Sequence, residues 1–350
     1  MRRKNQFLKL LLKVLLGITL AIVLTIGVLL IDASVKHKSK LKEEEKYMVY
    51  PGKMVNVDGR NIHVMHEGNE ESEYTLVFLH SNKVIDDSVV LQPLFKELKD
   101  YELVYIDRSG YGFSDDSDVS KDLESMVYET RTALKQVADR EKYILVASKS
   151  AGLEAIYWSF AYPDEVQAII GLEMYFPDEY TELKDNNYCS LGNRLLVKLV
   201  SIGAHRYAKN IYPTNEDSLY TDMQMKTRSA LVSKSLYTQG MYNEDAEVVK
   251  NGKALYDKGW PEDVKMYLLY ANPFMKPYVD ENERVQEVYN QVVEYGEEYD
   301  PVTSYNDYYR TYLAAYKNVT VEEISGPERL ITYNPSALAE KITQYIETLN

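Results

Sequence analysis

Residues 143–153 constrain the fold of this 350-residue chain more than any other stretch. They begin as a short apolar run, change abruptly to a segment dominated by small residues, and then follow a helical pattern as far as Pro163. This order predicts a buried strand, a sharp turn and a helix. Small residues suit such a turn because the strand and the helix crowd its apex.

Strand-like and helix-like segments alternate along most of the chain. Apolar runs typical of strands in a parallel sheet occur at residues 74–79, 102–106, 166–172, 264–270 and 319–324. Helical spacing is found at residues 89–99, 123–139, 153–162, 281–295 and 335–349, and residues 54–66 form a hairpin pattern around Asp58-Gly59. The alternation predicts an α/β protein with a mostly parallel central sheet flanked by helices. It stops over residues 174–261, where helical pieces such as 195–201 and 223–237 predict an insertion.

The N-terminus has the composition of a membrane span. Residues 14–31 contain no charged side chain, and their 18 positions are Leu, Ile, Val, Ala, Gly or Thr. With the apolar residues before it, such a helix can cross about 30 Å of hydrocarbon. A cleaved signal peptide is the alternative, but the run is longer than a usual signal core and residues 32–35 make a poor cleavage site. We therefore expect an uncleaved signal-anchor.

Basic residues precede this span, which favours a single-pass protein of the cell membrane with a cytoplasmic N-terminus and an extracellular main domain. The chain then divides into a cytoplasmic basic tail, a transmembrane anchor, a charged stalk and a folded domain, at residues 1–13, 14–31, 32–48 and 49–350. Within the stalk, residues 36–46 show no apolar stripe, and we expect them to be a solvated linker.

The charge and cysteine counts exclude some classes of function. A net charge of −14 argues against a nucleic-acid partner, because binding to phosphates needs a basic surface. The single cysteine, Cys189, rules out an internal disulfide and a cysteine-based metal cage. We expect neither a metal nor a cofactor.

Four features give residues from about 50 to 350 a resemblance to the α/β-hydrolase superfamily. The most specific is the loop Asp107-x-x-Gly110-x-Gly112-x-Ser114, which matches that family's D-x-x-G-x-G-x-S pattern in full. The others are the strand that ends in His80-Ser81, the strand–turn–helix at 143–153, and the helix end at residues 161–166. The resemblance implies the α/β-hydrolase fold, with residues 174–261 as a helical lid over a cleft that holds a small-molecule or protein ligand. It also implies that His80, Ser81 and Asn82 form the oxyanion-loop region, without its usual glycine.

In this family the strand–turn–helix is the nucleophile elbow, and two registers compete for its apex. A G-x-S-x-G variant over residues 148–152 makes Ser150 the nucleophile. Counting fourteen residues back from Pro163, as in related hydrolases, puts Lys149 at the apex instead, and the pattern of the strand agrees with this register. We prefer Lys149.

The other members of the expected triad are also replaced. The family's catalytic histidine follows the last strand, but no histidine occurs after His205, and Glu328 falls at that position. Glu173, at the end of a strand, occupies an alternative acid position. The resemblance therefore implies a cleft with Lys149, Glu173 and Glu328, in which a buried ammonium would need a carboxylate partner. If the register is off by one residue, Lys149 points to solvent.

These observations predict a membrane-anchored, extracytoplasmic α/β-hydrolase-fold protein that has lost the Ser-His-Asp triad. Such a pseudoenzyme would bind a ligand or partner rather than hydrolyse one. The alternative is an active membrane-tethered serine hydrolase, esterase- or lipase-like or peptidase-like, that uses Ser150.

Overall fold

A computed structural model describes residues 2–49, 51–185, 188, 190–215, 218–294 and 300–349. Its centre is a sheet of eight strands in the order β1-β2-β4-β3-β5-β6-β7-β8. The strands are β1 Lys53–Val57, β2 Arg60–Gly68, β3 Thr75–Leu79, β4 Glu102–Asp107, β5 Tyr143–Ser148, β6 Val166–Leu172, β7 Lys265–Asn272 and β8 Val319–Ser325. β2 runs antiparallel to β1 and β4, and the other neighbours are parallel. The predicted α/β class and mostly parallel sheet are confirmed.

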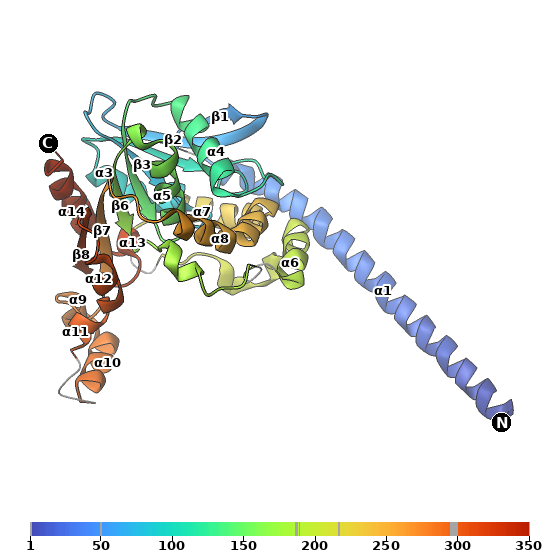
Figure 1. Cartoon of the computed structure of the whole chain (residues 1–350). Coiled ribbons are helices and arrows are strands. Elements are labelled where there is room, and N and C mark those ends of the chain that lie inside the picture. Colours follow the sequence, from blue (N-terminus) through green and yellow to red (C-terminus); the bar gives the residue numbers. More distant parts are fainter. Residues whose placement is uncertain are drawn as a thin grey trace.

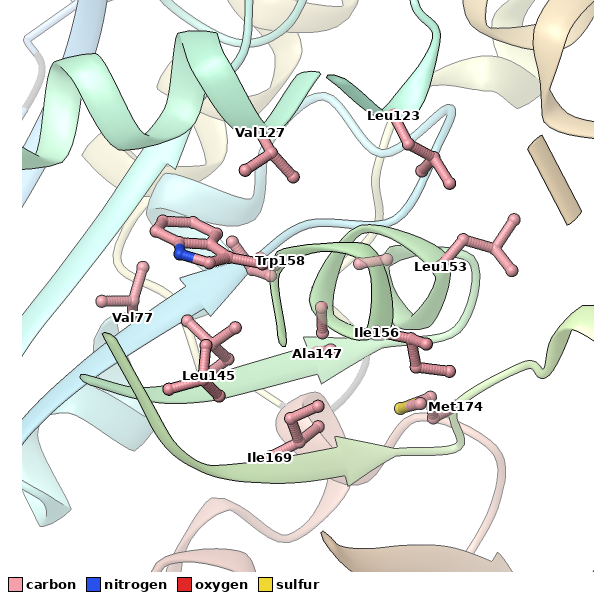
Figure 2. Close-up of a cluster of buried hydrophobic side chains, with 14 of the residues drawn as sticks. Val77, Leu123, Val127, Leu145, Ala147, Leu153, Ile156, Trp158, Ile169 and Met174 are labelled. Atoms are coloured by element: carbon pink, nitrogen blue, oxygen red, sulfur yellow. The ribbon is translucent and has the colours of Figure 1, made fainter. Parts of the chain in front are cut away.

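Helices cover both faces of the sheet (Figure 1). On one face α4 (Leu123–Lys135) and α5 (Ala151–Ala161) pack through Val127 and Trp158 onto strand residues such as Leu145, as Figure 2 shows. On the other face α3 (Gln92–Glu97) and α14 (Pro335–Glu347) cover the alternate strand positions, for example Val146. Neighbouring residues of β5 thus enter opposite cores, as the period of two in a strand requires.

A helical insertion separates β6 from β7. It contains the short 3₁₀ turns η3 (Pro177–Tyr180), η4 (Ala204–Tyr207) and η5 (Lys209–Ile211), and the helices α6 (Leu191–Ser201), α7 (Asp222–Ser235) and α8 (Gln239–Lys258). The predicted helical piece at 195–201 lies in α6, and the piece at 223–237 lies in α7 except for its last two residues. A second excursion between β7 and β8 holds α9 (Tyr278–Glu281), α10 (Glu283–Glu294), α11 (Pro301–Ser304) and α12 (Asp307–Leu313), where the sequence predicts one helix at 281–295.

The N-terminal helix α1 (Arg2–Glu44) is long and apolar enough to cross a membrane. It continues without a break through the predicted stalk, and its last turns pack against the insertion. His37 is buried, and Glu44 forms an ion pair with Arg206 at 2.7 Å. Residues 36–46 are mostly exposed, as expected of a solvated stretch, but they form a helix that contacts the insertion through His37 and Glu44. The polar side chains His37 and Glu44 make the contact, so a search for an apolar stripe does not find it.

Candidate functional site

The turn between β5 and α5 has Lys149 at its apex. Lys149 has a positive φ of 46°, whereas Ser150 has a helical φ of −63°. A positive φ is uncommon for a residue with a Cβ and identifies the strained position of the turn. Backbone hydrogen bonds from Lys149 N to Leu172 O and from Tyr175 N to Lys149 O hold this conformation.

The Lys149 ammonium lies near the carboxylate of Glu328. Its Nζ is 3.7 Å from Glu328 Oε2, and the two side chains are 33% and 65% exposed. We expected a buried ion pair, but this one is open to solvent. An exposed pair at this distance contributes at most about 1 kcal/mol to stability.

Glu173 shares this region, at the end of β6. It has a positive φ of 51°, and its Oε1 is buried without a hydrogen-bond partner among the described residues. Burial raises the pKa of Glu173 to about 7; the Lys149 charge opposes this rise and the Glu328 charge adds to it. A carboxyl with a pKa near neutrality exists in both protonation states under physiological conditions.

The Ser150 hydroxyl points into the loop after β3. Its Oγ accepts a hydrogen bond from Asn82 N at 3.0 Å, and it lies 3.2 Å from Asn82 Oδ1 and 3.0 Å from Ser81 Oγ. In the α/β-hydrolase superfamily, which the sequence resembles, this loop supplies hydrogen-bond donors to the oxyanion. Here the Asn82 N–H, a candidate donor, is engaged by Ser150.

The five histidines all serve elsewhere. His80 is buried, its Nδ1 lies 2.8 Å from Ser81 O, and burial together with the Arg108 charge lowers its pKa to about 3. His63 contacts Asp107 and His66 contacts Glu102; His37 and His205 lie at the junction of α1 and the insertion. Among the described residues around Lys149, no histidine lines a cavity.

Two cavities meet at Lys149, and Glu173 and Glu328 line both. The first has a volume of 460 Å³ and lies between the sheet, the loop after β3 and the insertion. From the insertion it is lined by Thr214, Asn215, Leu219, Tyr220 and Arg228. The second has a volume of 280 Å³ and four tyrosines in its wall, namely Tyr175, Tyr270, Tyr305 and Tyr309.

Asp87, at the start of α2 (Asp87–Val90), is a cavity residue that the sequence analysis missed. It lines the first cavity and is 9% exposed. Burial, and then the neighbouring charge of Asp86, raise its pKa well above the usual value. Asp86 itself pairs with Arg228 at 2.6 Å. The two adjacent acidic residues soon after the oxyanion strand were visible in the sequence, but nothing there distinguished the buried one.

A buried ionic network attaches the D-x-x-G-x-G-x-S loop to the insertion. Arg108 is 1% exposed and donates to Glu154 at 2.7 Å and to Glu244 at 2.9 Å. Glu154 belongs to α5, which follows the elbow, and Glu244 to α8. Arg108 also donates to His80 O at 3.1 Å. One guanidinium therefore connects the loop, the elbow helix, the oxyanion strand and the insertion.

Asp107 organises the same loop. Its carboxylate accepts hydrogen bonds from His63 Nδ1 at 2.8 Å, the Tyr105 hydroxyl at 2.8 Å and Phe113 N at 3.1 Å. Gly112 has a positive φ of 49°, and a Cβ there would overlap the Asp107 carboxylate. The conformation of the loop therefore depends on Asp107 and Gly112 together. Separately, the described His, Cys, Asp and Glu side chains include no group of three or more that could hold a metal ion.

Comparison with known proteins places the fold. No family model matches the chain. The uncharacterised protein YbdG of Bacillus subtilis (strain 168) is 28% identical over 250 residues, which cover 70% of this chain and 76% of that protein.

Solved structures resemble the chain over most of its length. A laboratory-evolved variant of a potato epoxide hydrolase matches with a TM-score of 0.58 and 15% identity, over 85% of this chain and 98% of that one. An epoxide hydrolase from Vigna radiata matches with a TM-score of 0.57 and 15% identity, over 85% of this chain and 97% of that one. Est816, described as an N-acyl homoserine lactone degrading enzyme, matches with a TM-score of 0.51 and 15% identity, over 83% of this chain and 99% of that one. At identities this low the similarity concerns the fold alone, and activity has to be argued from the residues of the site.

Proposed function

Because the chain has the α/β-hydrolase fold, we propose that it is a membrane-anchored pseudo-hydrolase that binds a ligand beside Lys149. The observation that carries this proposal is the positive φ of Lys149 at the elbow apex, where a hydrolase holds its nucleophile. A lysine ammonium beside Glu328 has no free electron pair with which to attack a carbonyl carbon.

The remaining groups also support a loss of catalysis. A serine nucleophile needs a base within hydrogen-bond reach. The partners of the Ser150 hydroxyl among the described residues are groups of Ser81 and Asn82, and neither is a base at neutral pH. Glu328, at the family's histidine position, has a 65% exposed side chain that lies 3.7 Å from the Lys149 ammonium and not beside a serine.

The proposed ligand is a small polar molecule in the 460 Å³ cavity, whose volume lies within the usual range for small-molecule sites. Asp87 would offer a proton as a hydrogen-bond donor, since its pKa is raised by burial. Lys149 would supply a positive charge and Arg228 a guanidinium already paired with Asp86. The insertion at residues 174–261, which borders this cavity, would act as its lid.

The same proposal assigns α1 as an uncleaved single-pass anchor of the cell membrane, with the N-terminus in the cytoplasm and the domain outside. The apolar, charge-free residues 14–31 and the basic residues before them support this orientation. We propose the boundaries 1–13 for the tail, 14–31 for the anchor, 32–48 for a stalk that begins as the continuation of α1 and packs its last turns against the insertion, and 49–350 for the domain.

A fluorophosphonate probe tests the loss of catalysis. The full chain in detergent micelles is incubated with the probe beside an active serine hydrolase, and covalent labelling is read on a gel. We expect the active control to be labelled and this chain to remain unlabelled. Labelling that is present in the native chain and lost in Ser150→Ala would instead establish the active membrane-tethered serine hydrolase.

A further inference from the structure

We infer that α6 is an interfacial helix that lies on the anionic lipid surface beside the membrane anchor; this rests on the proposed anchoring by α1. Part of the helix packs into the domain and the rest is exposed. Val197 and Val200 are buried in a small core of the insertion. Leu191, Leu195 and Leu196 are 84%, 59% and 41% exposed. Three exposed leucines on one short helix are unusual for a surface that faces only water.

The charges beside these leucines fit a lipid surface. Arg194 and Lys198 lie in the same helix and are exposed, and neither pairs with an acidic side chain of the described residues. They form a local basic patch in a chain whose net charge is −14. Leucines flanked by lysine and arginine are the composition of helices that lie in the headgroup layer, where the cations meet anionic lipid.

Contacts with α1 place the C-terminal end of α6 just above that layer. Gly203, two residues after α6 ends, touches His37, since a Cβ on Gly203 would overlap the His37 side chain. His37 follows Ile31, the last residue of the apolar run, by six positions (37 − 31), which is about 9 Å along a helix. The headgroup layer is about 5–8 Å thick on each side of the hydrocarbon. The C-terminal end of α6 is therefore held close to the headgroups.

The junction that sets this height is well connected. Arg206 donates to Glu44 through both terminal nitrogens, at 2.8 and 2.7 Å, and to His37 Nδ1 at 2.8 Å. The rings of His37 and His205 meet edge to face at 5.5 Å. In Figure 1 α6 lies on the side of the domain toward the membrane-spanning part of α1. Tyr207, 76% exposed in η4, adds an aromatic side chain of the kind that anchors proteins at the interface.

The consequence concerns the cavity. α6 belongs to the same insertion as α7, and α7 supplies Arg228 to the cavity wall while its Thr227 hydroxyl donates to Tyr47 O, just beyond α1. Lipid contact through α6 and the α1 junction would thus hold the cavity-lining insertion at a defined orientation above the membrane.

Depth-dependent fluorescence quenching in reconstituted vesicles tests the inference. The full chain, with Cys189→Ser, receives a fluorophore at Leu195→Cys, and a matched control receives it at Tyr128→Cys, an exposed position of α4. Both are reconstituted into phosphatidylcholine–phosphatidylglycerol vesicles that contain a nitroxide-headgroup lipid. We expect quenching at position 195 to be at least about threefold stronger than at 128, as for a helix seated in the headgroup layer.

Equal quenching at the two positions would overturn the inference while leaving the anchor intact, provided that the chain still floats with the vesicles. A chain that does not float would overturn the anchoring as well. Energy transfer between labels at 195 without lipid quenching would show that a second copy covers the leucines. Undiminished quenching in pure phosphatidylcholine, or in Arg194→Gln/Lys198→Gln, would refute the role of anionic lipid. The probe result at Ser150 is independent of all these outcomes.

Discussion

Replacement of Glu244 tests how the helical insertion is attached to the sheet. Its carboxylate is buried and accepts two hydrogen bonds from Arg108 Nη2, at 2.9 and 3.0 Å, and one from the Tyr111 hydroxyl at 2.7 Å. Burial opposes ionisation, but the Arg108 charge and the other contacts outweigh it, and the pKa of Glu244 lies below its usual value. Glu244→Ala removes all three contacts and leaves Glu154 as the carboxylate partner of Arg108.

The expected loss of stability follows from that burial. Removal of one partner of a buried ion pair costs about 3–5 kcal/mol, because the remaining charge is left without full compensation. With about 2.1 cal/mol/K of unfolding entropy per residue over roughly 300 folded residues, the melting temperature should fall by about 5–8 °C.

Circular dichroism of the full chain in detergent micelles measures this fall. Glu247→Ala is the matched control, because Glu247 lies one turn further along α8 and pairs with Lys250 at 2.9 Å on the surface. That surface pair contributes at most about 1 kcal/mol. Equal shifts for the two variants would refute the argument that the Arg108–Glu244 pair fastens the insertion.

Two further variants test the site and its supporting loop. The folded chain keeps the Glu173 proton up to pH about 7, whereas the unfolded chain releases it near 4.5, so this carboxyl lowers stability as pH rises through that window. The stability of Glu173→Gln relative to the native chain, measured by melting curves, should therefore rise between pH 4.5 and about 7 and stay constant at higher pH. A stability difference that does not change with pH would contradict this. Gly112→Ala should cost about 2–4 kcal/mol in denaturant titrations, because it adds a clash with Asp107 to the strain of a positive φ. Gly59→Ala, with a positive φ but open space around the new Cβ, isolates the strain alone, and an equal cost for both would exclude the clash.

The sequence predicted the sheet because its strands are continuous apolar runs. A strand that is buried on both faces of a parallel sheet needs apolar residues at successive positions, so it can be recognised from its own sequence. It also predicted crowding at the elbow. Gly152 has no room for a Cβ, which would overlap Met174 and Tyr175 O. The docking of α1 was not predictable in the same way. His37 and Glu44 are polar, and only their partners in the insertion turn them into contact residues.

The candidate site also combines features that local sequence predicts with features that depend on distant segments. The count back from Pro163 placed Lys149 at the apex, since the spacing from turn to helix end is a local property of strand and helix. The state of Asp87 and Glu173 is not local. Burial raises the pKa of each, and that burial comes from segments far away in the sequence, so two adjacent aspartates read alike until the chain is folded.

The contacts of the loop at residues 107–114 show whether its D-x-x-G-x-G-x-S motif indicates a fold or an activity. Asp107 is occupied by His63, Tyr105 and a backbone N–H, and Gly112 is required by the position of the Asp107 carboxylate. These contacts stabilise the junction of β2, β4 and the loop after β4, whichever residue stands at the elbow apex. A chain that replaces its nucleophile with lysine would keep the loop, because losing it would cost folding free energy. A complete D-x-x-G-x-G-x-S motif is therefore evidence for the fold, and evidence about hydrolysis has to come from the apex and its partners.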